Sequence, residues 1–204
     1  RKFTDDVEWS CEDGTRTDMD YMCKTVELAI KCGAKTINIP DTVGYTVPSE
    51  FTKIITTLKN KVPNIDKAIL SVHCHNDLGL AVANSLTGVS AGARQVECTI
   101  NGIGERAGNA SLAEVAVVLK DQLDAELSIE EANLTPVAEM VENFSGKRLA
   151  RNSPIVGEDV FTQTSGIHAD GDKKGVLYHN PIFPERFGRN RSYALGKMSG
   201  KASL

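Results

Sequence analysis

The residues with the clearest chemical potential are two histidines, His73 and His75, which follow an apolar run at residues 68–72. Side chains alternate between the two faces of a β-strand, so both histidines project from one face while Cys74 projects from the other. Two imidazoles at the end of a buried strand are well placed to share a divalent metal ion. The pair also suits two core histidines that only hydrogen-bond a neighbouring strand, so alone it leaves both interpretations open.

The chain around the histidines alternates strand-like and helix-like segments. The strands are expected at residues 7–11, 36–39, 68–72 and 95–100, each followed by a polar loop. The helices are expected at residues 18–32, 48–59, 79–91 and 111–123, with Asp18 as an N-cap and with Gly33 and Gly92 at helix C-termini. This alternation predicts an α/β fold with a parallel sheet. Four such units are half of an eight-stranded (β/α)8 barrel, and an open doubly wound sheet is the alternative.

The loops that follow the four expected strands carry most of the polar side chains of this region. Because the carboxyl ends of parallel strands meet at one edge of a sheet, we expect these side chains to lie close together. They are Glu12, Asp13, Asp41, Thr42, His73, His75, Asn101, Glu105, Arg106 and Asn109. Such a mixed nitrogen and oxygen donor set suits Mg, Mn, Co or Zn. Asp41 and Thr42 could instead do no more than cap the turn that follows their strand.

The loop at residues 101–109 is rich in glycine and precedes a helix. Glycines at Gly102 and Gly104 let a backbone approach a phosphate or a thioester closely, and a tight turn into the helix explains them equally well. The spacing is not that of a dinucleotide-binding fingerprint, because Glu105 and Arg106 follow the second glycine.

The sequence changes character near residue 126. We expect two parts: residues 1–126 with the four βα units, and residues 127–204 with a small, mostly helical and then irregular linker region. Residues 128–146 have a helical pattern, and from Asn152 onward the chain is rich in Gly, Pro, Arg and Lys with little periodicity.

Composition narrows the class of protein. The 204 residues have a net charge of -4, which gives no reason to expect nucleic acid or an anionic membrane surface as a partner. The five cysteines form no CxxC pair, which favours reduced thiols in a cytoplasmic protein. No apolar run approaches the roughly 18 residues that a membrane span needs.

Three segments together resemble a known family. The run at residues 37–48 (INIPDTVGYTVP), the His-x-His segment at residues 71–79 and the loop at residues 101–109 closely resemble the 2-isopropylmalate synthase family. That family belongs to a wider group of metal-dependent TIM-barrel acyltransferases and lyases, which includes homocitrate synthase, citramalate synthase and hydroxymethylglutaryl-CoA lyase. The resemblance extends from about Val7 to Ser199 and implies the second half of a TIM barrel followed by the linker subdomains.

The resemblance also implies roles for individual residues. His73, His75 and Asn109 match metal ligands, with Mn or Mg favoured as the divalent metal. Thr42 matches the residue that hydrogen-bonds the oxo acid, and Glu12 matches a carboxylate that assists proton transfer. In the linker region, His168 matches a catalytic histidine that reaches a neighbouring subunit of a homodimer, and Tyr178 matches a tyrosine near it. The acetyl-CoA loop is expected at Gly102, Gly104, Glu105 and Arg106.

The implied reaction is the condensation of acetyl-CoA with 2-oxoisovalerate, followed by thioester hydrolysis to 2-isopropylmalate and CoA in leucine biosynthesis. Citramalate or homocitrate synthase is the alternative within this class, and a non-catalytic metal-binding or partner subunit is the alternative outside it. The family's Arg-Asp-Gly segment, which provides a substrate arginine and a further metal ligand, has no match here. We therefore expect these residues to be part of a longer enzyme, inactive by themselves.

Overall fold

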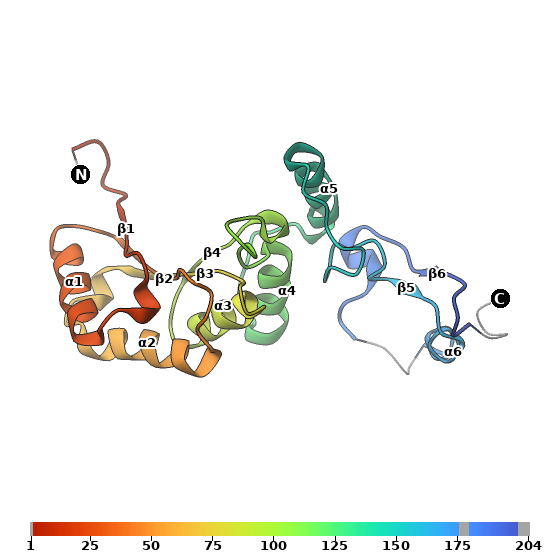
Figure 1. Ribbon diagram of the computed structural model, residues 1–204, viewed down its shortest axis with the longest axis horizontal. Coiled ribbons are helices and arrows are strands. Elements are labelled where there is room, and N and C mark those ends of the chain that lie inside the picture. Colours follow the sequence, from red (N-terminus) through yellow and green to blue (C-terminus); the bar gives the residue numbers. More distant parts are fainter. Residues whose placement is uncertain (1, 176–179, 200–204) are drawn as a thin grey trace. The chain divides into compact units, whose positions relative to one another are not determined.

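The computed structural model (Figure 1) describes residues 2–175 and 180–199, and the chain divides into two units. The first unit is Arg1–Ala125 and the second is Glu126–Leu204. The first contains the His-x-His pair and the Gly-rich loop.

The first unit is built from four parallel strands in sequence order, β1-β2-β3-β4. The strands are β1 (Glu8–Ser10), β2 (Thr36–Asp41), β3 (Ile69–Cys74) and β4 (Gln95–Glu97). The helices are α1 (Met19–Lys31), α2 (Pro48–Lys61), α3 (Ala81–Ser90) and α4 (Leu112–Leu123), with short 3-10 helices η1 (Gly14–Arg16), η2 (Ile65–Lys67) and η3 (Ile100–Gly102). The four expected βα units are confirmed. Their consecutive order is that of a barrel segment, whereas a doubly wound sheet reverses its strand order.

The hydrophobic core of this unit lies between the helices and one face of the sheet. Ile37 and Ile39 of β2 and Val72 of β3 are fully buried on that face. They pack in one cluster with the apolar stripes of the helices, including Val26, Phe51, Ile55, Leu58 and Val115. The alternation of β2 and β3 therefore decides which residues face the helices and which face away.

The opposite face of the sheet is polar. The strand register aligns Ser10 with Asn38 and Asn38 with Ser71, and the Asn38 Nδ2 donates to Ser10 Oγ over 3.0 Å. One row further along the strands, His73 aligns with Pro40 and with Glu97. His73 therefore lies on the polar face, as the alternation predicts, and Cys74 is fully buried on the helix side.

The element ends follow local chemistry, and several differ from expectation. Strand β2 continues through Asp41 and strand β3 through Cys74, so His73 lies within its strand and His75 directly after it. As expected, Asp18 caps α1, because its side chain accepts from the Tyr21 N–H. Helix α3 begins at Ala81 and not at Gly79, because Gly79 has a left-handed φ of 72° and the Asn76 Oδ1 accepts from the Ala81 N–H. Strand β4 ends at Glu97, since the chain beyond it turns into η3.

The second unit contains short elements. They are α5 (Leu134–Ser145), β5 (Thr162–Gln163), α6 (Gly166–Lys173), β6 (Ser192–Tyr193), and the 3-10 helices η4 (Glu131–Asn133) and η5 (Pro184–Phe187). A mostly buried ion pair joins η4 to η5, because Arg186 donates to both carboxylate oxygens of Glu131 over 2.6 Å. The parallel pairing of β5 with β6 has no signal in the sequence. No helix among the described residues is long and apolar enough to cross a membrane.

Phe51 gives a direct test of the core. It is fully buried beneath the sheet, so we expect Phe51→Ala to lower the free energy of unfolding by about 3–5 kcal/mol. The neighbouring Thr52 of α2 is exposed, and Thr52→Ala is expected to change stability by less than about 0.5 kcal/mol. Urea unfolding of both variants measures the difference, and equal losses would contradict this packing.

Candidate functional site

His73 is oriented by a carboxylate on the adjacent strand. Its Nδ1 lies 2.9 Å from the Glu97 Oε2, and the two side chains are 26% and 30% exposed. Burial lowers the pKa of His73, while the neighbouring Asn109 amide and Glu8 oppose that shift. The neutral imidazole, which is the form that binds metals, is therefore favoured. With Nδ1 directed at Glu97, Nε2 is left for a ligand.

Glu97 is itself held by the far strand of the sheet. A hydrogen bond with Glu97 raises the pKa of Glu8, and Gln95 Nε2 donates to the Glu8 Oε2 over 2.9 Å. This polar row connects β1 with β4 on the same face as His73. It fixes the carboxylate that sets the orientation of the His73 ring.

His75 is oriented by a backbone carbonyl. Its Nδ1 lies 2.7 Å from the Thr42 carbonyl oxygen. Because a carbonyl oxygen can only accept, Nδ1 must carry a proton, and in the neutral imidazole this leaves the lone pair on Nε2. The His73 and His75 ring centroids are 5.0 Å apart with their planes nearly perpendicular. Both histidines thus have one nitrogen engaged and the other available, which is the arrangement typical of metal-ligating histidines.

Asn109 supplies an oxygen beside the two rings. Its backbone forms an isolated bridge with His75, and its Nδ2 donates to the Ile103 carbonyl over 3.0 Å. Its Oδ1 is buried and has no hydrogen-bond partner of good geometry among the described residues, although the amide lies close to His73. A buried acceptor without a donor is costly, and a cation is one group that satisfies it. Gly104 makes room for this amide, since a Cβ there would collide with the Asn109 Nδ2.

These three side chains fit a divalent metal ion, with two imidazole nitrogens and one amide oxygen as donors. Residues 2–175 and 180–199 contain no group of three or more His, Cys, Asp and Glu side chains that could hold a metal. The candidate set is therefore His73, His75 and the Asn109 amide.

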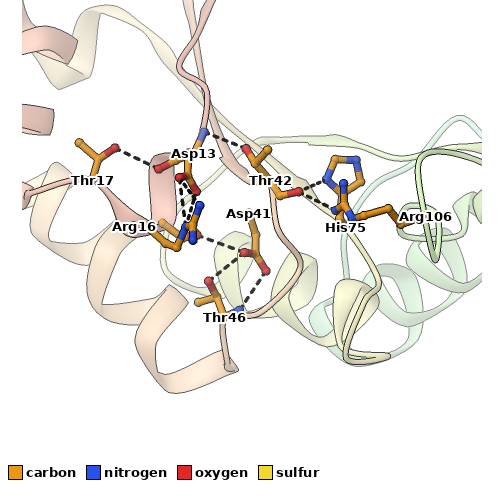
Figure 2. A network of polar contacts seen from close by, with 9 residues as sticks. Asp13, Arg16, Thr17, Asp41, Thr42, Thr46, His75 and Arg106 are labelled. Atoms are coloured by element: carbon orange, nitrogen blue, oxygen red, sulfur yellow. Dashed lines mark hydrogen bonds and ion pairs between the residues drawn. The ribbon is translucent and has the colours of Figure 1, made fainter.

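Thr42 contacts His75 through its backbone carbonyl, and its hydroxyl lies on the side of the loop after β1. The Asp13 N–H donates to the Thr42 Oγ1 over 2.9 Å, which leaves the hydroxyl proton available for a second partner (Figure 2). Glu12 precedes Asp13 in the turn between β1 and η1, and it is exposed. The loop after β1 thus meets the loop after β2 at the position where the sequence predicts substrate contacts.

Asp41 is a structural residue. Its buried carboxylate accepts from the hydroxyls of Thr15 and Thr46 over 3.1 and 2.9 Å, and from the Thr46 N–H (Figure 2). It projects to the helix side of the sheet, away from His73. The interpretation that Asp41 caps the turn after its strand is the one that these contacts support.

The Gly-rich loop is a tight turn that folds back on itself. The Asn109 N–H donates to the Gly102 carbonyl over 2.9 Å, and Glu105 and Arg106 lie exposed at the outer end. The Arg106 guanidinium donates to both oxygens of Asp77 and to the Thr42 carbonyl. These contacts explain the glycines by backbone geometry, while a contact with acetyl-CoA stays a prediction.

The remaining predicted residues belong to the second unit. His168 lies exposed on α6. Tyr178 lies outside the described residues.

Three contact residues were not predicted from the sequence: Glu97, Asp77 and Asn76. For Glu97 the signal was available, because strand alternation puts it on the same face as Gln95, beside the histidine strand.

Curated relatives share most of this sequence. The 2-isopropylmalate synthases of Shewanella sediminis (strain HAW-EB3) and Shewanella amazonensis (strain ATCC BAA-1098 / SB2B) are each 55% identical over 195 residues. Each alignment covers 94% of this chain and 37% of the relative, so the chain spans little more than a third of their length.

Solved structures share the fold. The hydroxymethylglutaryl-CoA lyase from Pseudomonas aeruginosa matches with a TM-score of 0.61 at 19% identity, over 73% of this chain and 51% of that one. The HMG-CoA lyase of Bacillus subtilis matches with a TM-score of 0.60 at 22% identity, over 71% of this chain and 51% of that one. In sequence, residues 1–141 match the HMGL-like family, which includes all four βα units and both histidines. This chain belongs to the HMGL-like family.

Proposed function

We propose that this chain is part of a metal-dependent 2-isopropylmalate synthase, which condenses acetyl-CoA with 2-oxoisovalerate and hydrolyses the thioester to 2-isopropylmalate and CoA. The relatives with that name are 55% identical over 94% of the chain. The observation that carries the proposal is the grouping of two oriented imidazoles with the buried Asn109 Oδ1, which has no hydrogen-bond partner of good geometry among the described residues.

His73, His75 and Asn109 would hold the divalent metal, and the resemblance to the 2-isopropylmalate synthase family favours Mn or Mg among the ions that this mixed nitrogen and oxygen donor set accepts. The bound ion supplies Lewis acidity toward the oxo group of the substrate. Glu97 and the Thr42 carbonyl keep the two imidazoles in the tautomer that leaves Nε2 available.

The other residues handle substrate and protons. The Thr42 hydroxyl, which already accepts from Asp13, donates to the oxo acid. Removal of a proton from the acetyl methyl group needs a positioned base near neutral pH, a role that suits His168 with Glu12 assisting. The linker region at residues 127–204 would bring His168 and Tyr178 to the site of a neighbouring subunit. A homodimer and a cytoplasmic location complete the proposal.

Substrate choice is tested on the complete enzyme that contains this chain. We expect CoA release from acetyl-CoA to be faster with 2-oxoisovalerate than with pyruvate or 2-oxoglutarate by about 10-fold or more, because a pocket shaped for one side chain discriminates by contact. A thiol assay of CoA release measures all three. Preference for pyruvate or 2-oxoglutarate would replace the proposal by citramalate or homocitrate synthase, and no turnover with any of them would overturn it.

The metal site is tested through Glu97, which orients the His73 ring. We expect Glu97→Ala to weaken Mn²⁺ binding by about 10–100-fold, because the imidazole loses the group that fixes its tautomer and orientation. Titration of the complete enzyme with Mn²⁺, followed by the electron paramagnetic resonance signal of free Mn²⁺, gives the affinity.

Glu27→Ala is the matched control for this experiment. Glu27 lies on α1 with a side chain that is also 30% exposed, and it is paired with Lys31. Its removal is expected to leave the Mn²⁺ affinity unchanged. Equal effects of the two substitutions would contradict the role given to Glu97.

A further inference from the structure

The Thr42 carbonyl accepts two hydrogen bonds, and they come from different loops. His75 Nδ1 lies 2.7 Å from it, and Arg106 Nη2 donates to the same oxygen over 2.7 Å. Figure 2 shows both side chains converging on this oxygen from the side opposite Asp13. One backbone atom after β2 is therefore shared by the loop after β3 and the loop after β4.

Asp77 holds the other side of the Arg106 guanidinium. The Arg106 Nε and Nη2 donate to the Asp77 Oδ1 and Oδ2 over 2.8 and 2.9 Å, a planar, two-bonded pair. Such pairs fix the direction of a guanidinium as well as its position. The pair also holds the pKa of the Asp77 carboxyl below its usual range. The ion pair with Asp77 therefore fixes the direction in which the Arg106 guanidinium points toward the Thr42 carbonyl.

The backbone around this pair is adapted to it. Gly44 lies so close to Asp77 that a Cβ would collide with the Asp77 carboxylate, and the Leu78 N–H donates to the Gly44 carbonyl over 3.2 Å. Arg106 itself has a φ of 51°, a left-handed conformation that a residue with a long side chain rarely adopts. Such a conformation persists only where surrounding contacts determine it.

From these contacts we infer that Arg106, held by Asp77, is a positioning residue of the site. It fixes the Thr42 carbonyl, and through that single oxygen it fixes both the tautomer of His75 and the place of the Thr42 hydroxyl. This inference rests on the proposed function and extends it. It also differs from the contact with acetyl-CoA that the sequence predicts for Arg106, and the two roles affect different measured quantities.

The test compares Arg106→Ala, Asp77→Ala and the double variant in the complete enzyme. We expect each single change to weaken Mn²⁺ binding by about 10-fold and to raise the KM for the oxo acid, since both groups fixed by Thr42 lose their support. The KM for acetyl-CoA is expected to stay within about twofold. Because the two residues act as one unit, the double variant should lose no more than Arg106→Ala alone.

A matched control exists in the second unit. Arg151 donates to both carboxylate oxygens of Asp159 over 3.0 and 2.7 Å, so it forms the same kind of pair. Neither residue contacts a candidate ligand among the described residues. We expect Arg151→Ala to leave the Mn²⁺ affinity unchanged, which separates the loss of an ion pair from the loss of this particular pair.

Unchanged Mn²⁺ affinity in Arg106→Ala, with a raised KM for acetyl-CoA, overturns the inference and makes the loop a contact for the coenzyme. If Arg106→Ala does not fold, Asp77→Asn provides the test: a weakened Mn²⁺ affinity supports the inference, and an unchanged one overturns it.

The wild type separates the inference from the proposed function. A wild type that binds Mn²⁺ but releases no CoA refutes the proposed function alone, because the role of Arg106 is still measured by Mn²⁺ affinity. A wild type that binds no Mn²⁺ refutes both.

Discussion

The geometry of the site depends on how the backbone groups beyond the strand ends are satisfied. Where a parallel ladder stops, its last N–H and C=O groups need new partners, and here neighbouring loops supply them. The His75 N–H donates to the Asp41 carbonyl, the Asn76 N–H donates to the Gly108 carbonyl, and the Ala110 N–H donates to the Cys74 carbonyl. These main-chain hydrogen bonds join the loops after β2, β3 and β4. They thereby set the positions of the candidate site side chains on those loops.

The polar face of the sheet carries further hydrogen-bonding groups below the strand ends. Asn38 Oδ1 and Ser71 Oγ are buried acceptor and hydroxyl groups without partners among the described residues, one row below His73 and Glu97. In contrast, the helix side of β2 and β3 is buried and mostly apolar, with Asp41 at the end of β2 as its charged residue. The two faces of one sheet therefore have separate tasks, since one supplies the packing energy and the other carries hydrogen-bonding groups.

The sequence predicted the fold of the first unit well, because strand alternation and helix caps are local signals. Asp18, Gly33 and Gly92 marked helix ends correctly, and the alternation around Cys74 assigned His73 to the polar face. The end of the helical segment at Gly146 was also predicted, since that glycine ends α5 in a left-handed conformation, whereas the helix begins at Leu134 and not at residue 128. In contrast, the role of a backbone acceptor such as the Thr42 carbonyl could not be predicted, because every residue type has the same carbonyl group. The pairing of β5 with β6 joins segments of two residues, which is too short for any periodic pattern.

The sheet order has a consequence for synthesis of the chain. Each strand pairs with the strand that came immediately before it, so each new βα unit can add to a surface that is already built. The ring of His75 obtains its acceptor as soon as β3 joins β2, since that acceptor belongs to the loop just before α2. The His73 ring obtains its partner only when Glu97 of β4 has been synthesised, and Asn109 follows twelve residues later. The proposed donor set is thus completed in the order of translation, and a nascent chain that ends before the turn into α4 lacks the Asn109 amide of that set.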